Sequence, residues 1–151
     1  AVVAPFEEGS AIMFRVASYK NNMLSEAEVN ITAAIEENID GKLVSKFYQI
    51  EPTLKKINSF SLNWTLVHKI DSNSPFYGFS EDDFKNTDIE LIIMIKAFDE
   101  VFANTVVQRT SYITPEIVYG ARFLPMYHSS EDNKTTILDL DKIDDYQVVK
   151  I

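Results

Sequence analysis

The chain of 151 residues contains no cysteine, so it has neither disulfides to hold a secreted fold together nor a thiolate for catalysis. Its four glycines and five prolines occur singly and form no linker. His68 and His128 are the only two histidines, which excludes a histidine-rich metal site. Because the length suits one hydrophobic core, we expect a single domain over residues 1–151, with no metal and no cofactor.

Long hydrophobic runs are also absent. The most apolar window covers residues 89–98, and Glu90 and Lys96 interrupt it. Spanning a bilayer takes about 20 apolar residues, so this window is too short. No signal-peptide pattern is visible. Since the chain begins with Ala1 rather than Met, we expect it to be a piece of a longer protein.

Basic residues are the scarcer charge: 14 lysines and arginines stand against 23 acids, for a net charge of −9. This balance disfavours nucleic acid or an anionic membrane as the main partner. The sequence has no nucleophile elbow, phosphate loop, dinucleotide fingerprint or zinc-protease motif. Adjacent acids such as Asp82-Asp83 and Asp144-Asp145 are typical of solvated surface. We therefore expect no catalytic residue and no enzyme.

The clearest pattern present is strict alternation over residues 24–37. Ala27, Val29, Ile31, Ala33 and Ile35 share one face, whereas Glu26, Glu28, Asn30, Thr32, Ala34 and Glu36 share the other. A period of two predicts a long strand with one wet face. Further strands are predicted over residues 11–18, 42–50, 60–70, 89–98, 105–112, 116–119, 124–128 and 135–138. Residues 89–95 are apolar on both faces, which predicts a central strand.

Turn signals separate these strands. Asp40-Gly41 and Asp132-Asn133 are typical of hairpin tips, and Ser80 followed by acids is typical of a helix start. Many short strands with one short helix predict an all-β fold, an antiparallel immunoglobulin-like β-sandwich. The tail from residue 139 is compatible with a helix or with a final strand over residues 146–149.

Two blocks carry the strongest resemblance. The first, WTLVHKIDSNSPFYGF, runs from Trp64 to Phe79, where a strand ends in His68 and then breaks into a Ser-Pro turn. The second combines VQRTSY, ending at Tyr112, with PEIVYGARFLP, ending at Pro125, and it has Tyr119 where a Trp is usual. Their order and spacing resemble the cytoplasmic domain of inward-rectifier potassium channels, especially the bacterial branch. His68 itself is interpreted as a structural histidine, with a pH-sensitive or interface role as the alternative.

The resemblance implies a homotetramer on the cytoplasmic side of the membrane, in which immunoglobulin-like domains surround the path of potassium ions. It implies that the missing part of the protein is a transmembrane pore whose gate this domain regulates. Glu26 matches an acidic position that faces the pathway, and Ala103, Asn104 and Thr105 match the loop that narrows it. Lys96 stands where many relatives carry an acid, so strong block by polyamines is not expected.

Arg15 and Lys20 match basic positions that influence the response to anionic lipid in relatives. The alternatives are a structural ion pair for Arg15 and a solvated turn position for Lys20. A competing function is a soluble β-sandwich that binds carbohydrate or a protein partner, with Tyr19, Tyr48 and Tyr127 as an aromatic platform.

Overall fold

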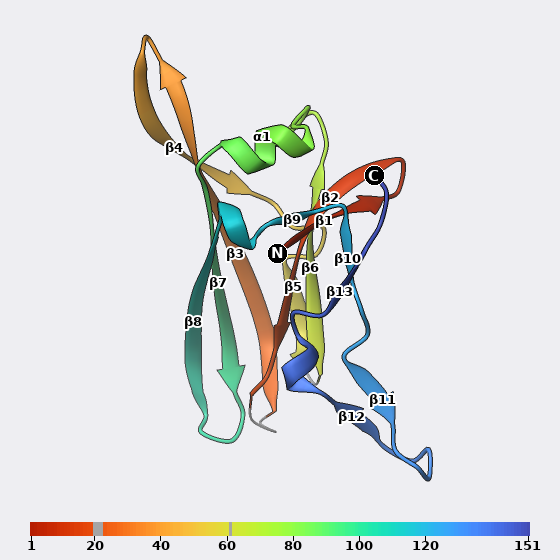
Figure 1. The fold of residues 1–151 in the computed structure, drawn as a ribbon. Helices are drawn as coiled ribbons and strands as arrows, with labels where there is room; N and C mark the ends of the chain where they lie inside the picture. The colour runs from red at the N-terminus through yellow and green to blue at the C-terminus, as the bar shows by residue number, and fades with distance from the viewer. Residues whose placement is uncertain (20–22, 61) are drawn as a thin grey trace.

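The computed structural model describes residues 1–19, 23–60 and 62–151, and its strands form two main layers (Figure 1). The first sheet has the order β6-β2-β1-β9 and the second the order β4-β3-β7-β8, with β5 paired to β3. The strands are β1 (Val2–Phe6), β2 (Gly9–Ala17), β3 (Leu24–Ile39), β4 (Lys42–Ile50), β5 (Lys56–Phe60), β6 (Asn63–Ile70), β7 (Ile89–Asp99), β8 (Asn104–Ile113) and β9 (Val118–Tyr119). The predicted all-β sandwich is confirmed.

Short elements complete the chain. β10 (Ala121–Phe123) pairs with β13 (Tyr146–Val148), and β11 (Tyr127–Ser129) pairs with β12 (Thr136–Leu138). The helical elements are α1 (Glu81–Asn86) and the 3-10 turns η1 (Thr114–Glu116) and η2 (Leu140–Lys142). The tail therefore contains the strand alternative, β13, after a 3-10 turn. One pairing departs from an antiparallel fold, because β1 runs parallel to β9.

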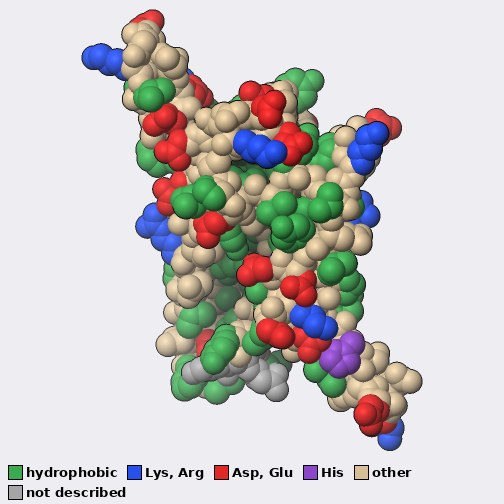
Figure 2. All heavy atoms as spheres, viewed as in Figure 1, with side chains coloured by type: hydrophobic (Ala, Val, Ile, Leu, Met, Phe, Trp, Pro, Cys, Tyr) green, Lys and Arg blue, Asp and Glu red, His purple; other side chains and the backbone are tan. Residues whose placement is uncertain are grey.

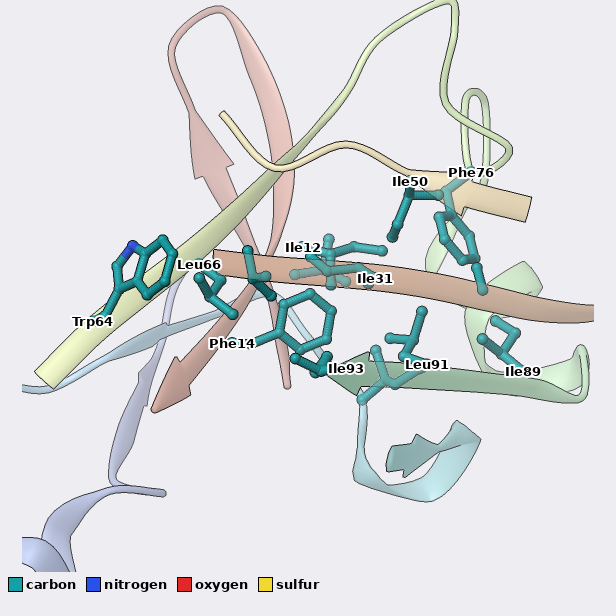
Figure 3. Packing of buried hydrophobic residues seen from close by; sticks show 14 of the residues in the cluster. Ile12, Phe14, Ile31, Ile50, Trp64, Leu66, Phe76, Ile89, Leu91 and Ile93 are labelled. Atoms are coloured by element: carbon teal, nitrogen blue, oxygen red, sulfur yellow. The ribbon is translucent and has the colours of Figure 1, made fainter. Parts of the chain in front are cut away.

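The core lies between the two main sheets. Ile12 and Phe14 of β2 and Leu66 of β6 meet Ile31 of β3 and Ile93 of β7, and all five are almost fully buried (Figure 3). Burying such side chains contributes about 1.5–3 kcal/mol each. The alternating face of β3 is the buried one, as predicted, and β7 lies between β3 and β8, which confirms its central place.

The helix α1 closes one end of the sandwich (Figure 1). Ser80 and Asp83 form a capping box: the Asp83 amide donates to Ser80 Oγ (3.2 Å), and the Ser80 amide donates to Asp83 Oδ2 (2.7 Å). Phe84 then packs its ring on Phe76, with 5.5 Å between the ring centroids. The predicted helix start is confirmed.

Three predicted strand boundaries are wrong. The stretch 60–70 divides into β5 and β6, because β5 pairs with β3 and β6 pairs with β2 in the opposite sheet. The stretch 124–128 contains only the start of β11, since Pro125 lacks the amide that a ladder needs. The stretch 116–119 begins in η1, a 3-10 turn that starts at Thr114 and includes Pro115. The strand β1 was not predicted from the sequence.

Position 120 accommodates only glycine. Its φ is +70°, and a Cβ atom built there would lie 2.9 Å from the Val149 carbonyl oxygen. The Val149 amide donates to the Gly120 carbonyl (2.8 Å), so this close approach holds the C-terminal segment against the sandwich. Any larger residue would both strain the backbone and push that segment away.

Candidate functional site

The site begins with a β-bulge at Glu26. Ser25 lies opposite Phe98 and Glu28 lies opposite Lys96, so Glu26 and Ala27 together oppose Ala97 alone. Glu26 has a φ of +51° and is exposed, whereas Ala27 is buried. The extra residue re-aims the strand and shifts its alternation, since Leu24 before the bulge and Ala27 after it both pack toward the core. The Glu26 side chain is therefore exposed, and its backbone forms no ladder pair with β7.

The turn between β7 and β8 lies at the same end of the sheet, and it carries the other predicted residues (Figure 1). Asp99 Oδ1 accepts hydrogen bonds from the amides of Val101 (2.9 Å) and Phe102 (3.2 Å). Ala103 follows with a φ of +52° and ends the turn, and Asn104 and Thr105 are the first two residues of β8, so residues 103–105 are the place where the turn passes into the strand. The role of Asp99 was not predicted from the sequence, although an Asp just before a turn commonly hydrogen-bonds to the turn's backbone amides.

A backbone bond joins this turn to the start of β3. The Glu100 amide donates to the Met23 carbonyl at 3.1 Å. The structure thus brings Glu26 together with Lys96 and residues 103–105 of the β7–β8 hairpin, which come much later in the sequence. They share one end of the sheet formed by β3, β7 and β8.

Residues of both charge signs lie next to one another on β3, β5 and β7 near this end. Glu28 lies opposite Lys96 of β7 on one side and opposite Lys56 of β5 on the other. With Glu26, the group holds two acids and two lysines, and no dense acidic column results from these four residues. Lys96 is exposed. A cation near this surface therefore meets both signs of charge at short range.

The turn also exposes apolar side chains. Val101 is 64% exposed and Phe102 is 69% exposed, and Met23 next to them is 67% exposed. Exposed aromatic and aliphatic groups grouped on a turn mark a contact surface more often than isolated ones do.

Arg15 is buried, and it binds backbone carbonyls. Its Nε donates to the Ile143 carbonyl (2.9 Å), its Nη2 to the Lys142 carbonyl (2.7 Å), and its Nη1 to the Leu124 carbonyl. The guanidinium also lies over the Phe123 ring, 4.5 Å from the centroid. Where the sequence suggested an ion pair as the alternative role of Arg15, the structure shows contacts with backbone carbonyls. Lys20 lies outside the described residues.

His68 is a buried, fully bonded histidine. Nδ1 lies 2.8 Å from the Glu51 carbonyl oxygen and Nε2 lies 2.8 Å from Ser74 Oγ. A carbonyl only accepts, so Nδ1 carries the proton and Nε2 accepts the Ser74 hydroxyl. Ser74 Oγ in turn accepts the Phe76 amide (3.2 Å). Burial lowers the pKa of His68, although the Glu51 carbonyl opposes the shift.

The three tyrosines of the competing interpretation do not form a platform. Tyr48 lies on β4, where its hydroxyl donates to Glu37, and Tyr127 lies on β11 in a different sheet. Tyr19 is 86% exposed and follows β2.

The described residues contain neither a metal-binding cluster nor a membrane-spanning helix. No group of three or more His, Cys, Asp and Glu side chains in this part of the chain could hold a metal ion. None of the helices described there has the length and apolar character needed to cross a membrane.

Comparisons with known proteins show which family the sequence matches. A sequence model described as the inward rectifier potassium channel C-terminal domain matches residues 1–151. The chain is 30% identical over 142 residues, 93% of its length, to the inward rectifier potassium channel Kirbac3.1 of Paramagnetospirillum magnetotacticum. It is 31% identical over 87% of its length to the ATP-sensitive inward rectifier potassium channel 8 of Mus musculus. It is 25% identical over 93% of its length to the inward rectifier potassium channel irk-1 of Caenorhabditis elegans.

The chain spans only part of each of these relatives: 48% of the first, 32% of the second and 27% of the third. The match nevertheless extends over the whole of this sequence, including both blocks that carry the resemblance. The chain belongs to the family of inward rectifier potassium channel C-terminal domains.

Proposed function

We propose that four copies of this chain surround the path of potassium ions on the cytoplasmic side of a membrane, and that they regulate a gate in the transmembrane part of the protein. Glu26, Lys96, Ala103, Asn104 and Thr105 face the path, with the turn at residues 103–105 at its narrow point. No reaction is catalysed.

The observation that carries this proposal is the register of β3, β7 and β8. It gathers an exposed acid, an exposed lysine and the small and polar residues 103–105 at one end of one sheet. Small side chains suit a turn where four copies approach an axis. The bulge at Glu26 also supports the proposal that Glu26 faces the path, because bulges re-aim side chains at functional positions.

Self-association is supported by the outer face of the second sheet. Phe47, Met94, Val107 and Ile113 are on the face opposite the core, and their exposed fractions are 68%, 41%, 59% and 50%. A stable monomer rarely leaves so many large apolar side chains on one face. Copies of the chain that pack through this face would cover them.

Gating is proposed to occur by rigid-body motion between copies, which widens or narrows the opening at residues 103–105. The Asp99 hydrogen bonds and the Glu100–Met23 backbone bond make the turn move with the sheet. In the proposed response to anionic lipid, Lys20 is the direct contact. Arg15 contributes by holding the C-terminal segment, because carbonyls engage its donors.

The experiment is Asn104→Trp in the full-length channel, measured as potassium flux into liposomes. Four indoles near the axis would obstruct the path, so most of the flux should be lost. Asn86→Trp is the matched control, since Asn86 is an exposed residue at the end of α1, at the opposite end of the molecule (Figure 1). Unchanged flux in a folded, tetrameric Asn104→Trp channel would remove this turn from the ion path.

A further inference from the structure

A cleft of about 500 Å³ opens between the two main sheets, near the end where β7 turns into β8. β2 forms one wall, and β7 with β8 forms the other, while Ile143 of the C-terminal segment also lines the cleft. Figure 2 shows a hollow with hydrophobic side chains in this part of the molecule. We call it the β2–β8 cleft. Its volume falls within the range of small-molecule sites, about 300–1,000 Å³.

The walls of the β2–β8 cleft are mainly apolar. Ile93, Ile95 and Ala97 come from β7, Val106 from β8, and Phe60 from the end of β5. Ile95 is half-buried and Val106 is 37% exposed, so neighbouring side chains leave part of this surface uncovered. Gln108 and Thr110 add a polar amide and a hydroxyl to the β8 side.

The charge of the lining determines which ligand chemistry fits. Among the described residues that line the cleft, Arg15 is the one cation, and no carboxylate is present. The Arg15 guanidinium already donates to the carbonyls of Leu124, Lys142 and Ile143. Among the described lining residues, a phosphate or carboxylate would therefore find no free cationic donor, and an ammonium group would find no carboxylate. Burying either ion without a partner is unfavourable.

We propose that the β2–β8 cleft binds a neutral, largely apolar small molecule with one hydrogen-bonding group. Its apolar body packs on Ile95 and Val106, and its polar group bonds to Thr110 or Gln108. Binding is independent of the channel function. One consequence does depend on the proposed channel function. Ala97 and Val106 belong to β7 and β8, the two strands that meet at residues 103–105. A molecule bound in the cleft would therefore stiffen the proposed narrow point of the ion path.

The test uses 2-naphthol as the neutral probe and 2-naphthyl phosphate as its charged counterpart. Methyl NMR spectra of the whole chain are recorded during titration with each. We expect 2-naphthol to give saturable shifts of the Ile93, Ile95 and Val106 methyl signals, with nuclear Overhauser contacts between probe and Ile95. The phosphate should bind at least about tenfold more weakly.

Val106→Phe fills the mouth of the cleft and should weaken 2-naphthol binding about tenfold. Val44→Phe is the matched control, because Val44 is 42% exposed on β4 and does not line the cleft. The proposal is overturned if 2-naphthol gives no saturable shift at these methyls, if the phosphate binds as tightly, or if a folded Val106→Phe chain binds unchanged. Should Val106→Phe not fold, the contacts to Ile95 in the unmodified chain decide the question.

Discussion

Lys96 on β7 lies directly opposite Glu28 on β3, beside the bulge that carries Glu26. Lys56 on β5 is opposite Glu28 on the other side. An acid flanked by two lysines contributes little net negative potential, and in a fourfold assembly each charge is repeated around the axis. The wall proposed here is therefore electrostatically mixed.

Lys96→Glu should convert this mixed wall into an acidic one. Each copy then exchanges one positive charge for a negative charge, so a polycation is held more strongly in the path. We expect spermine applied from the cytoplasmic side to block the current of the full-length channel at about tenfold lower concentration. Lys85→Glu, on the surface of α1, is the control. An unchanged spermine sensitivity in Lys96→Glu would argue against a path-facing Lys96.

Arg15→Lys should loosen the C-terminal segment. A lysine ammonium cannot reproduce the planar fork that reaches Leu124, Lys142 and Ile143, nor its contact with Phe123. The free energy of unfolding should fall by about 3 kcal/mol, because several charge-assisted hydrogen bonds are lost. Faster hydrogen exchange at the Val149 amide would report the detachment directly.

Arg122→Lys is the matched control for that experiment, since Arg122 is exposed on β10. It should leave both stability and the exchange at Val149 unchanged. Equal protection of Val149 in the Arg15→Lys and unmodified chains would show that the β-strand pairing alone holds the segment.

The buried His68 makes stability depend on pH. Burial lowers its pKa below the ordinary value of 6.5, so the unfolded chain takes up this proton at a higher pH than the folded chain does. The free energy of unfolding should therefore fall as the pH drops below 6.5 and approaches the folded pKa. For one proton the slope cannot exceed about 1.4 kcal/mol per pH unit.

His68→Gln should remove this component of the pH dependence, because an amide cannot be protonated in this range. His128→Gln, at an exposed histidine on β11, should keep it. Denaturant unfolding at several pH values measures both. A slope that persists unchanged in His68→Gln would assign the effect to other groups.

The sequence predicted those parts of the fold that depend on local pattern. The bounds of β4, Lys42–Ile50, were predicted correctly from the Asp40-Gly41 turn signal and the residues that follow it, because the hairpin turn fixes where the strand begins. The alternation over β3 correctly identified its buried face, although Ala34 on the other face is buried as well. By contrast, β1 was missed because its Val2–Phe6 stretch is short, lacks alternation and contains Pro5.

The site could be predicted in part, and only through resemblance. The one local sign of the bulge at Glu26 is Leu24, which a strict alternation would place on the wet face but which packs against the core. The contacts of Arg15 reach residues more than 100 positions away, and such pairings follow from the assembled fold. That Glu26, Lys96 and the turn at residues 103–105 share one end of a sheet depends on strand register, which composition does not determine.

The central claim is that the turn at residues 103–105 lines the ion path, and the absence of native cysteines in this chain allows one direct measurement. Asn104→Cys is introduced into the full-length channel, with the other parts made cysteine-free. A positively charged methanethiosulfonate is then applied from the cytoplasmic side while the current is recorded. The account predicts a rapid, irreversible loss of most of the current, reversed by reductant, with no loss in Asn86→Cys. A current that stays unchanged after complete modification of Asn104→Cys would contradict it.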